Sequence, residues 1–182
     1  MYGGYYPPPA SSVTVSYPPI SFVDQTGRDI DLRVYGDGPV ENELDSLVEM
    51  YLDFDPAHRT LGIPPAEEGR IRAWLETLLD GYCVVAWEGN RAAGQAVLLE
   101  DGSGSYELAI FLHQDYHRAW IGTYMMWSLF SYGKQQGVER VWLLVERENR
   151  VAVNLYHDVG FVTTEVQGSE VEMSIDLSPL PG

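Results

Sequence analysis

The segment from residue 107 to residue 124 constrains the fold more than any other, because a strand pattern gives way to a helix pattern inside it. Residues 108–112 place alternating apolar side chains on two faces, which is typical of a buried or half-buried strand. A polar turn follows at 114–118, and from Ile121 onward the apolar spacing is helical. Unpaired backbone N–H groups and the positive end of the helix dipole face the same point there, with Gly122 in the first turn. The segment therefore predicts an anion site.

The charge of the chain is strongly unbalanced, with 27 acidic residues, 11 basic residues and a net charge of −16. Lys134 is its only lysine. Carboxylates stay hydrated in concentrated salt, where the Debye length falls to about 3 Å, so this surface suits the cytoplasm of a halophile. An ordinary acidic protein kept soluble by its charge is the alternative. The same charge argues against nucleic acid as a partner, because non-specific binding requires basic patches.

A chain of 182 residues is long enough for one domain with a sizeable core. Residues 1–20 are rich in Tyr, Pro, Gly and Ser, so we expect a disordered tail there and a single domain over residues 21–182. A Tyr/Pro interaction motif is the alternative for the tail. No signal peptide is visible, and the longest apolar stretch, 120–132, is too short to span a bilayer. We expect a cytoplasmic protein with no membrane partner, in which Cys83 is plain core.

Apolar periodicity and turn residues predict the other elements. A strand at 30–34 pairs back on 22–23 through a turn at 25–27, and helices follow at 44–52 and from Pro64-Pro65 to Gly81. The remaining elements are strands at 82–87, 92–99 and 141–145, helices at 121–137 and 149–160, and a hairpin of 161–166 with 171–177. This order predicts an α/β (α+β) fold in which helices cover a mixed sheet.

Three local motifs accompany this order. Residues 117–122 read His-Arg-Ala-Trp-Ile-Gly at the start of a predicted helix, and residues 112–116 before them read Leu-His-Gln-Asp-Tyr. Asn149 precedes the third motif, Asn-Leu-Tyr-His-Asp-Val-Gly-Phe at 154–161. Together they resemble the GNAT superfamily of acyl-CoA-dependent N-acetyltransferases, over residues 28–177. That family has Gln/Arg-x-x-Gly-x-Gly/Ala, Val-His-Pro-Asp-Tyr and Asn…Leu-Tyr-Glu-Lys-Leu-Gly-Phe at these places. The resemblance implies a GNAT-like central sheet, mixed and mostly antiparallel, of about six to seven strands flanked by about four helices.

The resemblance implies acetyl-CoA as a co-substrate and no metal. Backbone N–H groups from Arg118 to Thr123 would hold the pyrophosphate, and the edge of the strand ending at Leu112 would pair with the pantetheine arm. His117 and Arg118 would attract the anionic cofactor to a protein of net charge −16. The implied cofactor residues are Leu112, His117, Arg118, Ala119, Trp120, Ile121, Gly122, Thr123 and Asn149. The other three histidines, His58, His113 and His157, share no metal-ligand spacing.

Two residues depart from the family's loop. His117 replaces the usual Gln or Arg, and Trp120 replaces the first Gly, which gives permissive dihedral angles and lets a ligand approach the backbone closely. Trp120 can still serve if its φ is negative and its ring turns away from the pyrophosphate, and its ring could also cover the cofactor. The alternative is a loop that has lost the cofactor. Gly122 is retained, which favours a working loop.

Members of the family generally use direct attack by the amine in a ternary complex, with a strand carboxylate as base and a tyrosine as acid. Tyr156 matches that tyrosine, although it could instead be a core aromatic. Glu107 is the candidate base, because burial in an apolar strand would raise its pKa, although it could also be an exposed strand-end residue. Four carboxylates are weaker candidates for substrate contact: Glu100, Glu146, Asp53 and Asp55.

The resemblance implies an enzyme that transfers an acetyl group from acetyl-CoA to a primary amine of a small molecule or protein. The family builds its acceptor side mainly from the first two helices and nearby loops. Acidic residues there could suit a cationic acceptor or simply belong to the acidic surface: Glu43, Glu49, Asp53, Asp55, Glu67 and Glu68. The alternative is a non-catalytic module that keeps the fold and binds an acyl-CoA or a partner protein. We expect a monomer or homodimer.

Overall fold

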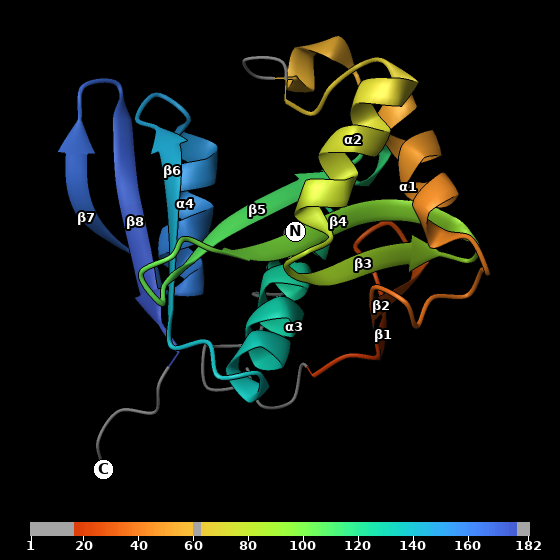
Figure 1. The fold of residues 1–182 in the computed structure, drawn as a ribbon, viewed down its shortest axis with the longest axis horizontal. Coiled ribbons are helices and arrows are strands. Elements are labelled where there is room, and N and C mark those ends of the chain that lie inside the picture. Colours follow the sequence, from red (N-terminus) through yellow and green to blue (C-terminus); the bar gives the residue numbers. More distant parts are fainter. Residues whose placement is uncertain (1–16, 60–62, 178–182) are drawn as a thin grey trace, which may run out of the picture.

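The computed structural model describes residues 17–59 and 63–177, in which eight strands form one mixed sheet (Figure 1). The strands lie across it in the order β1-β2-β3-β4-β5-β6-β8-β7, and all neighbours are antiparallel except β5 and β6. Their bounds are β1 (Ile20–Val23), β2 (Asp29–Val34), β3 (Tyr82–Glu88), β4 (Arg91–Glu100), β5 (Tyr106–Leu112), β6 (Arg140–Glu146), β7 (Val162–Gln167) and β8 (Glu170–Asp176).

Four α-helices occur in the described ranges, together with the short 3₁₀ helices η2 (Pro56–His58) and η3 (Gln114–Tyr116). They are α1 (Glu43–Leu52), α2 (Glu68–Leu78), α3 (Ile121–Gln135) and α4 (Arg150–Val159). Local sequence sets their ends: the Asn42 side chain accepts a hydrogen bond from Asp45 N at 3.2 Å and starts α1. Gly160 ends α4 with a φ of 121°, a conformation that costs glycine no strain.

Helices cover both faces of the sheet, α1 and α2 on one face and α3 and α4 on the other (Figure 1). Strand residues alternate between the two faces, so the molecule has two apolar cores. Leu47, Leu75 and Trp87 lie in the core beneath α1 and α2, whereas Phe130 lies in the core beneath α3 and α4. Cys83 is buried in the first core, where burial raises the pKa of its thiol to about 12. The prediction that Cys83 is plain core is therefore confirmed.

The predicted α+β class, with its mixed and mostly antiparallel sheet, is confirmed. The sheet has eight strands instead of six to seven, because the short segment Ile20–Val23 is a full strand that pairs with β2, Phe22 opposite Ile30. The prediction of a helix start at Pro64-Pro65 is wrong, since α2 begins at Glu68. Glu67 keeps extended dihedral angles, and the acidic side chain of Glu68 then lies in the first turn, where the helix dipole stabilises it.

Two further expectations concern the N-terminal tail and the membrane. Residues 1–16 of the predicted 1–20 tail lie outside the described residues, whereas Tyr17 contacts the ring of Tyr132 and Ile20 is the first residue of β1. As for the membrane, no helix in the described part of the chain combines the length and apolar character that crossing a bilayer requires.

Candidate functional site

Strands β5 and β6 run parallel but are paired only where they begin. Tyr106 is in register with Val141 and Glu107 with Trp142, and the recorded pairing stops there. β5 continues to Leu112 and β6 to Glu146, and the two strands diverge along this length (Figure 1). The edge of β5 that faces β6 therefore presents backbone groups from 108 to 112 that no described strand takes up. Such groups are strong hydrogen-bonding partners for a ligand that enters the gap.

The loop that follows β5 has left-handed backbone at two residues that are not glycine. The φ angles are 59° at Arg118 and 67° at Trp120, and Ala119 between them has no positive φ. The condition of a negative φ at Trp120 is therefore not met. The chain must turn from η3 into α3 within four residues, 117–120, and the left-handed conformation makes that turn. A side chain in this conformation costs roughly 1–2 kcal/mol, and alternating handedness forms a concave nest of N–H groups that suits an anion.

Helix α3 begins at this loop without a side-chain cap, since Trp120 is its N-cap residue. The first backbone bond of the helix runs from Tyr124 N to the Trp120 carbonyl at 3.2 Å. The N–H groups of Ile121, Gly122 and Thr123 precede it and have no acceptor within the helix. A Cβ atom on Gly122 would meet nothing within 4 Å, so the space there is open. Open space before uncapped amides at the positive end of a 15-residue helix suits a phosphate group.

His117 ties this loop back to β5. Its Nε2 donates a hydrogen bond to the Leu112 carbonyl at 2.8 Å, and its ring contacts the ring of His58, with centroids 4.8 Å apart. The imidazole therefore lies at the end of the strand edge that was predicted to pair with the pantetheine arm. Arg118 is exposed beside it and adds a positive charge near the start of α3, whereas the Ala119 side chain is buried.

Glu107 lies at the last paired position of β5, where the gap begins. Its side chain is half-buried and shares a strand face with Ala109 and Phe111, which pack in the core beneath α1 and α2. Burial, with a smaller contribution from the charge of Asp101, raises the pKa of the Glu107 carboxyl. Trp142, opposite Glu107, donates to Asp101 Oδ2 at 2.8 Å. A carboxyl with a raised pKa at the root of a gap can accept a proton from a nearby amine.

Tyr156 belongs to the other side of the sheet. It lies on α4, half-buried against the core beneath α3 and α4, with its ring edge-on to Phe161 at 5.7 Å. Burial raises the pKa of its hydroxyl, which stays protonated and finds no hydrogen-bond partner among the described residues. The structure thus places Glu107 and Tyr156 on opposite faces and joins them by no contact. Asn149 caps α4 by accepting from Ala152 N at 3.2 Å.

The weaker candidates have structural partners or lie in solvent. Glu100 and Glu146 are exposed at strand ends. Asp55 accepts from Ala57 N at 2.9 Å and starts η2, while Asp53 accepts a hydrogen bond from His113. In residues 17–59 and 63–177, no group of three or more His, Cys, Asp and Glu side chains is placed to hold a metal ion.

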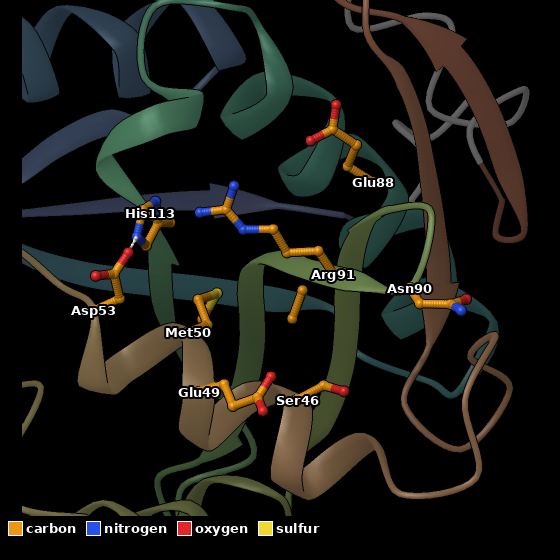
Figure 2. Close-up of a pocket in the computed structure, with 9 residues that line it drawn as sticks. Ser46, Glu49, Met50, Asp53, Glu88, Asn90, Arg91 and His113 are labelled. Atoms are coloured by element: carbon orange, nitrogen blue, oxygen red, sulfur yellow. Dashed lines mark hydrogen bonds and ion pairs between the residues drawn. The ribbon is translucent and has the colours of Figure 1, made fainter.

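A cavity of about 480 Å³ lies beside the other edge of β5, between α1 and the β3–β4 hairpin (Figure 2). Its walls come from α1, from the hairpin and from the residue after β5: Ser46, Glu49, Met50, Asp53, Glu88, Asn90, Arg91, Ala92 and His113. β5 separates this cavity from the gap that faces β6. It is therefore not the space predicted for the cofactor.

The sequence did not predict that Asp53, His113 and Gln114 join α1 to the loop after β5. His113 and Asp53 are hydrogen-bonded across 60 positions of the chain, and Gln114 contacts the backbone of the same segment. In the sequence, His113 and Gln114 stand out only as part of the Leu-His-Gln-Asp-Tyr motif, and His113 has no metal-ligand spacing to the other histidines. A histidine at the end of an apolar strand indicates a buried side chain. No pattern in the sequence indicates that its hydrogen-bond partner is Asp53.

A sequence model of the acetyltransferase (GNAT) family matches residues 44–161. No curated protein sequence matches the chain. Among solved structures, the GNAT domain of S. lividans PAT matches with a TM-score of 0.72 and 13% identity, over 86% of this chain and 96% of that one.

Two further structures carry ligands. YncA from Salmonella typhimurium, solved with its cofactor acetyl-CoA, has a TM-score of 0.60 and 17% identity, over 84% of this chain and 96% of that one. The PaiA N-acetyltransferase from Thermoplasma acidophilum, in complex with coenzyme A, has a TM-score of 0.60 and 22% identity, over 81% and 98%. At these identities the structural matches show a shared fold.

Proposed function

Because the chain belongs to the acetyltransferase (GNAT) family, we propose that it transfers an acetyl group from acetyl-CoA to a primary amine by direct attack in a ternary complex. The observation that carries this proposal is the gap between β5 and β6, which leads to the loop and the uncapped amides at the start of α3. A pantetheine arm in the gap would bond to the free edge of β5, and the pyrophosphate would meet the N–H groups from Arg118 to Thr123.

In the proposed reaction, Glu107 takes a proton from the acceptor ammonium and leaves a neutral amine, whose nitrogen attacks the thioester carbonyl. The nitrogen of the tetrahedral intermediate gives up its second proton to water, and collapse of the intermediate breaks the C–S bond and releases the thiolate of coenzyme A. Tyr156 gives its proton to that thiolate. The raised pKa of Glu107 supports its role, because the carboxyl binds a proton more readily than an ordinary carboxyl. Tyr156 is protonated, as a general acid must be, and its role is argued from its place in the motif, since burial raises its pKa and makes its proton harder to give.

The acceptor would approach over the face of the sheet that carries Glu107. Trp142 and Leu144 lie on this face of β6, and the side chain of Leu144 is 45% exposed. Carboxylates surround it, because Glu172 is in register with Leu144 and Glu146 follows on the same face. An amine that carries an apolar group and a positive charge suits this surface, whether it is a small molecule or part of a protein.

Binding of acetyl-CoA is the first test. Calorimetry in about 1 M salt, where screening reduces the repulsion between an anionic cofactor and a protein of charge −16, should give a single site. A thiol-release assay over a panel of primary amines then tests transfer. Binding without release with any amine would favour the non-catalytic module, and absence of binding would overturn both.

Tyr156→Phe tests the acid. We expect kcat to fall roughly 100-fold, as for loss of a general acid, while the Kd for acetyl-CoA changes less than about twofold. The folded state should not suffer, because the hydroxyl has no described partner to lose. An unchanged kcat would show that Tyr156 is only a core aromatic.

A further inference from the structure

His113 is a buried imidazole at the point where β5 ends. Only 1% of it is exposed, and its backbone N donates to the Ala93 carbonyl at 2.9 Å, the last bond to β4. Nδ1 accepts from Asp115 N at 3.1 Å, so Nε2 carries the proton and donates to Asp53 Oδ2 at 2.9 Å (Figure 2). His113 thus connects β5 with the residue that follows α1. β5 leads to the loop proposed to hold the cofactor, residues 117–123, which is called the cofactor loop below.

Gln114 makes a second connection with the same segment. Its Nε2 donates to the Asp53 carbonyl at 2.6 Å, and its Oε1 accepts from Asp55 N at 3.0 Å. One amide therefore holds two backbone groups, which fixes the segment from Asp53 to His58 relative to the loop. The contact between the His58 and His117 rings adds a third point, three residues before Trp120 in the left-handed turn.

Packing holds this place on one side, where the buried ring of Phe54 lies edge-on to the His113 ring with centroids 5.8 Å apart. On the other side, the cavity of about 480 Å³ lies between the last turns of α1 and the β3–β4 hairpin (Figure 2). The Asp53 side chain is 72% exposed, so the junction is also open to solvent on that side. The end of α1 is therefore held to the loop after β5 by this ring contact and by the hydrogen bonds of His113 and Gln114.

We propose that Gln114 and His113 are positioning residues that fix the acceptor-side segment Asp53–His58 on the cofactor loop, so that binding of the cofactor orders both. This inference rests on the proposed function, in which the loop holds acetyl-CoA and the segment after α1 borders the acceptor. Ordering the loop lowers the remaining cost of ordering the segment, so each ligand favours the binding of the other. Linkage makes this coupling reciprocal.

Hydrogen exchange with coenzyme A as the probe tests the proposal. In the wild type, coenzyme A should slow exchange of the backbone amides of both 117–123 and 53–58, the latter roughly fivefold, the lower end of typical coupling. In Gln114→Ala, only 117–123 should be slowed. Gln114→Glu should be intermediate, since it still accepts from Asp55 N but cannot donate to the Asp53 carbonyl.

Gln136→Ala is the matched control, because Gln136 is an exposed glutamine at the end of α3, and it should keep the wild-type response. Gln114 is only partly buried, so its variants should fold, which thermal unfolding checks. If coenzyme A slows amide exchange only at 117–123 in the wild type, this inference is overturned and the proposed function stands. Slowing of 53–58 that survives in Gln114→Ala would also overturn it. Slowing of neither segment would overturn both proposals.

Discussion

The two edges of β5 differ sharply in how their backbone groups are used. On the β4 side, all seven residues from Tyr106 to Leu112 are in register with a partner strand. On the β6 side, pairing is limited to Tyr106 and Glu107, after which the strands diverge. The first edge forms a closed wall of the core, and the second leaves donors and acceptors for a ligand. One strand thus supplies both rigidity and a binding edge, which suggests that changes on its two sides should affect different properties.

Glu107→Gln should have the largest effect, because Glu107 lies where the two edges become unequal. Loss of a general base should lower kcat/KM roughly 10²- to 10⁴-fold. The base acts when deprotonated, so wild-type kcat/KM rises with pH through the pKa of Glu107, which burial raises above that of an ordinary carboxyl. The variant should lose this acidic limb, whereas Glu139→Gln, at an exposed position before β6, should retain it. A limb that persists in Glu107→Gln would remove Glu107 from the mechanism.

Gly122→Asp should block the phosphate site proposed at the start of α3 without lowering the stability of the fold. Its Cβ has free space, and an acidic residue in the first turn suits the helix dipole. The carboxylate would lie at the proposed phosphate site, where like charges repel by a few kcal/mol. Calorimetry should therefore show that the affinity for acetyl-CoA falls roughly 100-fold. Gly69→Asp is the matched control, since Gly69 is also the second residue of its helix and equally open. Equal affinities for the two variants would place the pyrophosphate elsewhere.

Tyr51→Phe tests the side of β5 that pairs with β4. The buried Tyr51 hydroxyl donates to Gln95 Oε1 at 2.6 Å, and the Gln95 amide in turn contacts Cys83 Sγ at 3.5 Å. Removing the hydroxyl leaves a buried carbonyl oxygen unpaired, so the free energy of unfolding should fall by about 2 kcal/mol. Chemical denaturation measures this, and the Kd for acetyl-CoA should stay within about twofold. A large loss of cofactor affinity would contradict the separation of the two edges.

The left-handed turn before α3 should show the smallest effect. Trp120→Gly and Trp120→Ala both remove the indole, but only glycine adopts a φ of 67° without strain. The glycine variant should therefore be more stable than the alanine variant, by about 1 kcal/mol. At the exposed helical residue Lys134, the alanine variant should instead be more stable than the glycine variant by about 1 kcal/mol, because alanine is the better helix former. Alanine more stable at both sites would mean that the turn relaxes when the indole is lost.

Local patterns were sufficient for most of the secondary structure. The change from alternating to helical spacing predicted the end of β5 and the start of α3 at Ile121, and Asn149 and Gly160 marked the ends of α4. These signals depend on neighbours in the chain, so a single sequence contains them. The start of α2 was misplaced, because the Pro64-Pro65 signal competes with the acidic first turn at Glu68.

The sequence by itself determined the order of elements, the resemblance to the family and the identity of the loop residues. Tertiary structure alone decided that β5 and β6 diverge, that Trp120 has a positive φ, and that His113 and Gln114 hold the segment after α1. These features arise from contacts between residues far apart in the chain and from the path that the backbone must take between packed elements. No periodicity or motif records them, because each depends on where a distant segment lies.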